Sequence, residues 1–147
     1  MTDKKSKQKK GRWVFITFGL ILSLGILLTG LKVGYDSFYN GYPDTPQMLK
    51  KINAISDDSN HKTVLIFHKP GCSDCLAARS TVKAAIKANK KNITYIVINK
   101  NDQAAQEVIT NYGITKYPTV VVLHGKQVVN SSADWQGEQF KQNLMGY

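Results

Sequence analysis

The chain of 147 residues has only two cysteines, four prolines and ten acidic residues, against twenty lysines and arginines. Cys72 and Cys75 are three positions apart, and no second cysteine pair is present to complete a four-cysteine zinc site. A zinc site with His68 and His124 as further ligands is a less favoured alternative. A structural disulfide between the two cysteines would close a very short loop and would restrict the unfolded chain little.

The residues around the cysteine pair predict a strand, a turn and a helix. Val64–Phe67 is short and apolar, and Lys69-Pro70-Gly71 follows it closely, as is typical of a buried strand. From Ser73 onward the spacing of apolar residues and alanines predicts an amphipathic helix. Cys72 then lies at the start of that helix, where free N–H groups and the helix dipole favour a negative charge on its sulfur. Cys75, one turn further, is placed to resolve a mixed disulfide, so this arrangement favours redox chemistry over two unrelated buried cysteines.

Charged residues are also absent from the segment between Trp13 and Leu31. As a helix this run of nineteen residues would reach about 28 Å, which is close to the hydrocarbon thickness of a bilayer. Residues 1–12 hold six basic residues and one acidic residue, and the positive-inside rule places this arm in the cytoplasm. A basic arm alone could bind nucleic acid, but the apolar run after it favours a membrane and no nucleic-acid partner.

The competing interpretation of this run is a cleaved signal peptide. The run is long for such a peptide, and the segment 28–32 contains no Ala-x-Ala cleavage site. No cysteine follows the run directly, which excludes lipoprotein attachment. We therefore expect a cytoplasmic arm over 1–12, a transmembrane anchor over 13–31, a tether over 32–44 and a folded domain over 45–147. With either interpretation the cysteines face the extracytoplasmic side, where disulfides persist.

Residues 45–147 predict one α/β domain. The expected elements are a helix capped by Thr45, the strand 64–67, the cysteine helix, a strand over 93–98, a helix capped by Asp102 and closed by Gly113, a hairpin that turns at 124–126, and a helix over about 135–144. Such alternation indicates a mixed sheet with helices on both faces. The aromatic side chains of the tether, Tyr42 among them, could lie at the membrane surface or pack on this domain.

The order of elements and the segments Phe67–Cys75 and Tyr112–Thr119 together resemble the thioredoxin superfamily. The resemblance implies a cis peptide bond before Pro118, beside the cysteine pair, where Tyr117 and Pro118 would shape the substrate groove. It also implies that Cys72 attacks, that Cys75 resolves, and that protein thiols and disulfides are the substrates. It implies no cofactor and no metal.

The proline-glycine pair before Cys72 also resembles anchored thioredoxins of Gram-positive bacteria that accompany bacteriocin or conjugation systems. Two positions depart from thioredoxin itself. Gly71 replaces a tryptophan, and Ile66 replaces the buried aspartate that thioredoxin uses as a proton relay. Deprotonation of Cys75 must therefore rely on another group or on water, and Asp74 is the nearest titratable side chain in the sequence. To His61, His68 and His124 we assign no catalytic role.

The sequence thus predicts a membrane-anchored, extracytoplasmic thiol–disulfide oxidoreductase that exchanges electrons with an unknown membrane redox partner. The direction of electron flow is open. The alternative is a non-enzymatic thioredoxin-like module that holds a partner of a secretion, bacteriocin or conjugation apparatus. In that alternative the cysteines would be dispensable.

Overall fold

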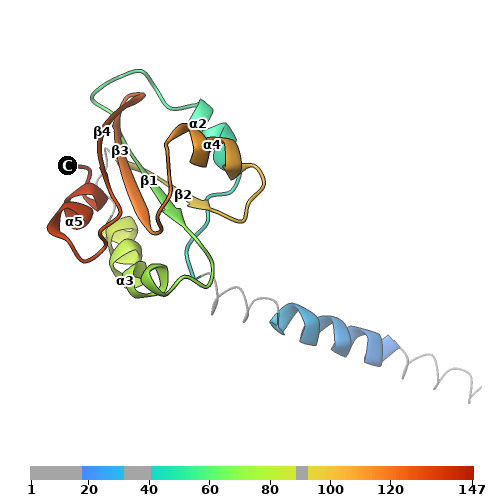
Figure 1. Ribbon diagram of the computed structural model, residues 1–147. Coiled ribbons are helices and arrows are strands. Elements are labelled where there is room, and N and C mark those ends of the chain that lie inside the picture. Colours follow the sequence, from blue (N-terminus) through green and yellow to red (C-terminus); the bar gives the residue numbers. More distant parts are fainter. Residues whose placement is uncertain (1–17, 32–40, 89–92) are drawn as a thin grey trace, which may run out of the picture. The chain divides into compact units, whose positions relative to one another are not determined.

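The computed structural model describes residues 18–31, 41–88 and 93–147 (Figure 1). The chain divides into two compact units, Met1–Phe38 and Tyr39–Tyr147. In the first unit residues 18–31 form a helix, and its large apolar side chains are exposed. Across the described ranges, no helix combines the length and the apolar character needed to cross a membrane. The basic arm, residues 13–17 of the expected anchor and residues 32–40 of the expected tether lie outside the described residues.

The second unit is built on a mixed sheet of four strands in the order β2-β1-β3-β4. The strands are β1 (Lys62–His68), β2 (Ile93–Asn99), β3 (Thr119–His124) and β4 (Gln127–Ser132). Strand β1 pairs parallel with β2 and antiparallel with β3, and β3 pairs antiparallel with β4. The two central strands, β1 and β3, are buried along almost their whole length. Burial on both faces explains why both are continuous apolar runs in the sequence.

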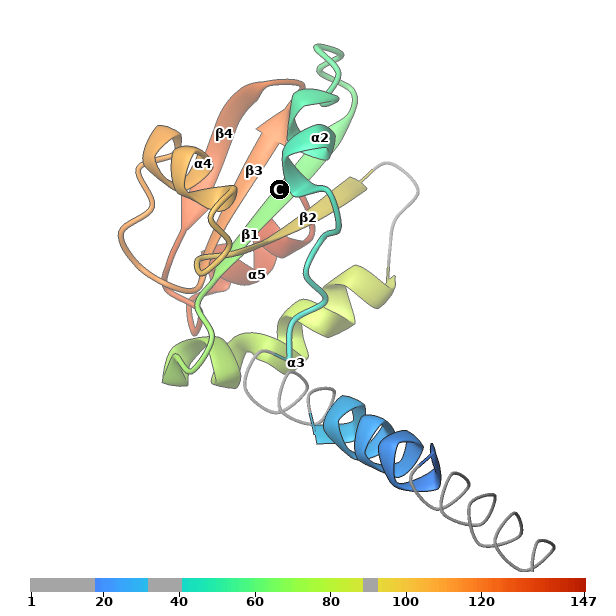
Figure 2. The same cartoon turned by 90° about the vertical axis from the view of Figure 1, so that its right-hand side faces the viewer.

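Helices cover both faces of the sheet (Figure 2). On one face lie α2 (Met48–Asn53) and α4 (Ala105–Asn111), and on the other lie α3 (Ser73–Ala88) and α5 (Glu138–Leu144). Side chains of β1 alternate between the two cores, because successive residues of a strand point to opposite faces. Leu65 and Phe67 belong to the core under α2 and α4, whereas Val64 and Ile66 belong to the core under α3 and α5. His68 follows Ile66 by two positions and so lies on the α3 side.

The predicted order of helices and strands and the mixed sheet are confirmed. Gly113 ends α4 as predicted, with a φ of +63°, and the N–H of Ile114 donates to the carbonyl of Ile109 at 2.9 Å. The hairpin is also confirmed, since β3 and β4 are joined by the two residues Gly125 and Lys126. Helix α5 begins at Glu138, three residues later than the sequence indicated.

Two predicted helix caps are wrong. Helix α2 begins only at Met48, and the Thr45 hydroxyl instead accepts the N–H of Val97 in β2 at 2.8 Å. The N–H of Thr45 donates to the carbonyl of the same valine at 3.0 Å. Before α4, the Asp102 side chain accepts the N–H of Ala104 at 2.9 Å, which places this carboxylate in a turn that precedes the helix. The contact of Thr45 spans 52 residues, and no local pattern predicts it.

Two glycines with similar backbone angles provide a matched test of the fold. Gly113 and Gly125 both have a positive φ, but only at Gly125 would an added Cβ meet a neighbour, the backbone oxygen of Asp57 at 2.8 Å. Gly113→Ala should cost about 1–2 kcal/mol, because an L-residue disfavours the left-handed region. Gly125→Ala should cost at least about 1 kcal/mol more, since the overpacked contact adds to the same backbone penalty. Urea unfolding followed by circular dichroism measures both losses, and equal losses would contradict the close approach at Gly125.

Candidate active site

Cys72 lies directly before α3, in the position of an N-cap residue. Its carbonyl accepts the N–H of Leu76 at 3.0 Å, and its Sγ accepts the N–H of Cys75 at 3.3 Å. The sulfur therefore occupies the place of the side-chain oxygen that usually caps a helix. The chain reaches this position through Gly71, which has a φ of +73°. The capping N–H and the positive end of the helix dipole would both stabilise a thiolate here.

Cys75 lies in the first turn of α3 and is only 2% exposed. Its Sγ accepts the N–H of Lys69 at 3.5 Å. The pKa of Cys75 is raised to about 12, chiefly by burial and in smaller part by the nearby Cys72 and Asp74, whereas the hydrogen bond from Lys69 opposes the shift. At neutral pH this side chain is therefore a neutral thiol. The two cysteines differ as the expected roles require, one half-exposed at the helix start and one buried.

The peptide bond between Tyr117 and Pro118 is cis. The Cys72 thiol donates to the Tyr117 carbonyl at 3.5 Å, so this bond lies beside the cysteine pair, as the resemblance implies. The Tyr117 ring is half-buried, and the Lys100 ammonium lies 5.7 Å from its centroid. The Tyr117–Pro118 segment is thus in direct contact with Cys72. That it forms the substrate groove stays a prediction.

Asp74 is exposed in the first turn of α3, and its charge acts on Cys75 by raising the pKa of that thiol. Its role as a proton relay stays a prediction. His68 and His124 cannot share a zinc site with the cysteines. His124 is paired with Lys62, six residues from His68 along β1, which corresponds to about 20 Å. Within the described ranges, no group of three or more His, Cys, Asp or Glu side chains could hold a metal ion.

The structure links His68, to which the sequence analysis gave no role, to Cys75 through its neighbours Lys69 and Tyr42. It is fully buried at the end of β1, and its Nε2 lies 2.5 Å from Oδ1 of Asp44. Its ring stacks on that of Tyr42, with centroids 4.3 Å apart and planes at 5°. The Tyr42 hydroxyl donates to the Cys75 carbonyl at 2.8 Å, so Tyr42 packs on the domain. Alternation along β1 after Ile66 is the signal that places His68 on this face.

The comparisons with known proteins agree with this geometry. The family model described as Glutaredoxin matches residues 64–128, a segment that includes both cysteines and the cis peptide bond. The germline-specific thioredoxin Deadhead of Drosophila melanogaster is 26% identical, with a TM-score of 0.53 over 66% of this chain and 87% of that one. No curated protein matches the chain.

Two further thioredoxins are similar in fold. That of Trypanosoma brucei brucei is 14% identical, with a TM-score of 0.54 over 69% of this chain and 85% of its own. That of Fasciola hepatica is 18% identical, with a TM-score of 0.54 over 67% of this chain and 88% of its own. The family model and these structures support a domain of the glutaredoxin/thioredoxin superfamily. The matched family suggests thiol–disulfide oxidoreductase activity in general.

The raised pKa of Cys75 predicts how this thiol reacts with alkylating agents. In a Cys72→Ser variant, alkylation of Cys75 by iodoacetamide should rise about tenfold per pH unit between about pH 7 and pH 10 without a plateau, because the thiolate is the nucleophile and burial, the largest cause of the shift, persists. The same variant unfolded in urea should react faster and reach a plateau near its ordinary pKa. Mass spectrometry follows the reaction, and a plateau below about pH 10 in the folded variant would contradict the shift.

Proposed function

We propose that this chain is a membrane-anchored, extracytoplasmic thiol–disulfide oxidoreductase in which Cys72 attacks and Cys75 resolves. The observation that supports it most directly is the position of the Cys72 sulfur. It caps α3, 3.3 Å from the N–H of Cys75, and lies 3.5 Å from the Tyr117 carbonyl that precedes the cis bond. A half-exposed sulfur in this place can both exist as a thiolate and meet the disulfide of another protein.

The reaction follows from the different surroundings of the two cysteines. The Cys72 thiolate attacks one sulfur of a substrate disulfide, a mixed disulfide forms, and the other substrate sulfur leaves as a thiolate. Cys75 then loses its proton and attacks the sulfur of Cys72, which releases the second substrate thiolate and forms the Cys72–Cys75 disulfide. The substrate gains two electrons and the cysteine pair loses two. The same steps in reverse oxidise a substrate dithiol, so one site serves either direction.

Substrate seating is assigned to the segment that contains Tyr117 and Pro118. It contacts the half-exposed Cys72, because the Tyr117 carbonyl accepts the thiol of Cys72. A substrate strand that approaches Cys72 would therefore run along this segment. Asp74 is exposed one residue before Cys75. Its carboxylate could bind polar or basic groups of such a strand, or relay a proton between Cys75 and solvent.

The membrane part of the proposal is based on the N-terminal residues. The uncharged run Trp13–Leu31 follows a basic arm, and the described residues 18–31 of this run are helical with exposed apolar side chains. Such a segment would anchor the chain with residues 1–12 in the cytoplasm. The redox domain would then work outside, and a membrane redox partner would restore the Cys72–Cys75 pair. This is the arrangement of the anchored thioredoxins of Gram-positive bacteria that the sequence resembles.

The assignment of the two cysteines is tested by trapping mixed disulfides in cells. Cys75→Ser should leave substrate proteins attached to Cys72, because the thiol that clears the intermediate is missing. Cys72→Ser should trap far fewer, since Cys75 is buried and its pKa is raised. The trapped species should appear as slow-migrating bands on non-reducing gels of membranes and disappear after reduction.

The double variant Cys72→Ser/Cys75→Ser is the control for bands that do not depend on these thiols. Equal trapping by both single variants would contradict the division of roles. Absence of trapping by either variant, with normal function of the host's secretion or conjugation system, would favour the non-enzymatic binding module. Mass spectrometry of the bands obtained with Cys75→Ser would identify the substrates.

The topology is tested with a reporter. Alkaline phosphatase fused after Tyr147 should be active, because it needs disulfides that form only outside the cytoplasm. The same enzyme fused after Arg12 should be inactive, since the basic arm is retained inside. Inactivity of the first fusion would contradict the proposed location. A mature protein shortened by about 30 residues would show that the apolar run is a signal peptide.

A further inference from the structure

Resolution of the mixed disulfide needs a base near Cys75. This thiol is buried against the sheet, and its pKa is raised to about 12, so only a very small fraction is deprotonated at neutral pH. The strand that packs beneath it offers no carboxylate, since Val64 and Ile66 are the residues of β1 in this core. A buried base must therefore come from another residue on the same face.

His68 is the next side chain of β1 on this face. Lys69 directly follows His68 in the chain, and its N–H donates to Sγ of Cys75 at 3.5 Å. The sulfur therefore lies beside the backbone that carries the His68 ring. Tyr42 makes a second connection, because its ring stacks on His68 while its hydroxyl donates to the Cys75 carbonyl. Nδ1 of His68 is buried and has no hydrogen-bond partner within the described part of the chain.

Asp44 determines which nitrogen of His68 is basic. A carboxylate accepts hydrogen bonds, so Nε2 of His68, 2.5 Å from Oδ1 of Asp44, must carry a proton. In the neutral ring Nδ1 is then left with a free lone pair inside the core. When Nδ1 gains a proton, the adjacent carboxylate compensates the positive charge, as it does for a histidine base oriented by an aspartate. An unpaired polar atom in a core is costly, and a proton-accepting role accounts for it.

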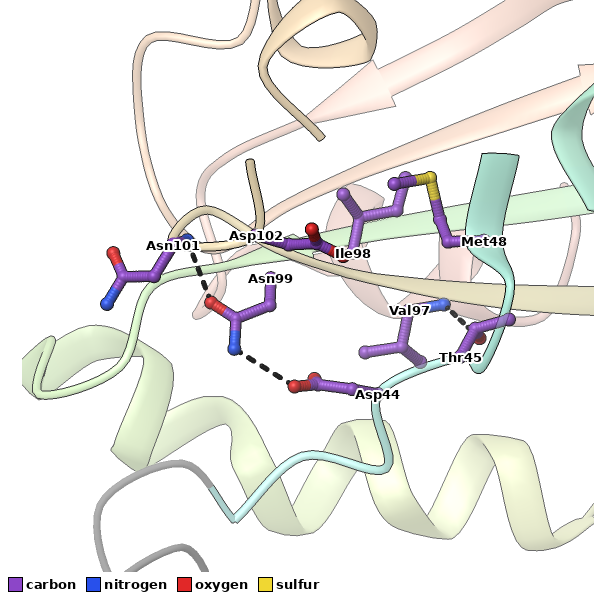
Figure 3. A pocket seen from close by; sticks show the side chains of 8 residues that line it. All are labelled: Asp44, Thr45, Met48, Val97, Ile98, Asn99, Asn101 and Asp102. Atoms are coloured by element: carbon purple, nitrogen blue, oxygen red, sulfur yellow. Dashed lines mark hydrogen bonds between the residues drawn. The ribbon is translucent and has the colours of Figure 1, made fainter. Parts of the chain in front are cut away.

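Asp44 also connects this buried pair to solvent. Its side chain is 36% exposed and lines a pocket of about 240 Å³ beside the end of β2 (Figure 3). There Oδ2 of Asp44 accepts the side-chain amide of Asn99 at 2.9 Å, and the N–H of Asn101 donates to Oδ1 of Asn99 at 2.9 Å. These bonds fix the carboxylate at the boundary between the buried ring and the open pocket. A proton that reaches His68 can thus exchange with water through the partly exposed Asp44.

We propose that His68, oriented by Asp44, accepts the proton that Cys75 loses when it resolves the mixed disulfide, an inference that rests on the proposed function. The proton moves to Nδ1 of His68, and the electron pair left on Sγ of Cys75 forms the bond to Cys72. The substrate sulfur departs as a thiolate with the electrons of the broken bond. No further oxidant or reductant is needed, because the substrate disulfide takes up both electrons.

The pH dependence of this step involves the other ionisable groups around the pair. From the segment before α2 these are Asp44 and Tyr42, whose pKa is raised first by burial and then by the charges of Cys75 and Cys72. Lys69 and Lys100 directly follow β1 and β2, and their backbone N–H groups donate to Cys75 and to the His68 carbonyl. At the start of α3 and within it lie Cys72, Asp74 and Arg79, whose charges act on Tyr42 or Cys75. Of these, Asp44 is the group bonded directly to the imidazole.

The test uses the purified full-length chain in detergent and 5,5′-dithiobis(2-nitrobenzoate) as the disulfide. Attack by Cys72 releases one coloured thiolate, and attack by Cys75 on the resulting mixed disulfide releases the second, so the two steps appear as separate absorbance phases. His68→Gln keeps an amide N–H for Asp44 but has no base. It should slow the second phase about 100-fold, within the usual range for general base catalysis, and leave the first phase unchanged. His124→Gln, at the opposite end of the sheet, is the matched control and should change neither phase.

The pH profile separates a proton acceptor from a packing residue. The second phase of the wild-type chain should fall at low pH, where the imidazole is already protonated. In His68→Gln it should rise about tenfold per pH unit and approach the wild-type rate at high pH, because hydroxide replaces the missing base. A variant slowed equally at every pH would show a structural role and would overturn the inference. So would a second phase that His68→Gln leaves unchanged.

Asp44→Asn provides a second, independent variant if His68→Gln does not fold, as judged by circular dichroism. It should slow the second phase less than loss of the imidazole would, and it should alter the low-pH limb of the profile. An unchanged second phase in Asp44→Asn would contradict the orienting role. If the wild-type chain itself shows no second phase, the proposed function fails, and that result differs from every outcome that overturns the role of His68.

Discussion

The site depends on the central position of strand β1, which is buried on both faces and paired along both edges. It holds parallel β2 on one side and antiparallel β3 on the other, and its side chains fill both cores. The chain leaves β1 at His68 and enters α3 only five residues later, so the cysteines are tied to a central, buried strand of the sheet. Strand β3 begins at the cis bond, directly opposite the end of β1. Pairing of β1 with β3 therefore brings the cysteine pair and the Tyr117–Pro118 segment together.

The same helix start gives the two cysteines opposite properties. The Cys72 sulfur accepts the N–H of Cys75 at the start of the helix, whereas the Cys75 side chain packs among apolar side chains. The helix dipole stabilises a negative charge only within about the first turn. Burial has the opposite effect, because it disfavours the charged form of a thiol. A spacing of three residues is thus enough to separate an attacking sulfur from a resolving one. The chemistry needs no metal ligand set to produce this difference.

Local patterns were sufficient for the elements and for the cysteine pair. Continuous apolar runs identified β1 and β3, and the glycine after α4 and the turn at Gly125 marked two boundaries that the structure confirms. The resemblance, together with these elements, gave the cis bond beside Cys72. Contacts between distant segments could not be predicted in this way. Asp44 meets His68 across 24 residues and Thr45 meets Val97 across 52, and nothing in the residues between them indicates either bond.

The two hydrogen bonds between Thr45 and Val97 have a consequence for the edge of the sheet. Strand β2 is an edge of the sheet, and an edge with free N–H and carbonyl groups can recruit a strand from another chain. Thr45 occupies both backbone groups of Val97, the N–H through its hydroxyl and the carbonyl through its own N–H. The segment before α2 thus acts as a partial fifth strand. It leaves fewer backbone groups of β2 free to pair with another chain, without adding a full strand to the fold.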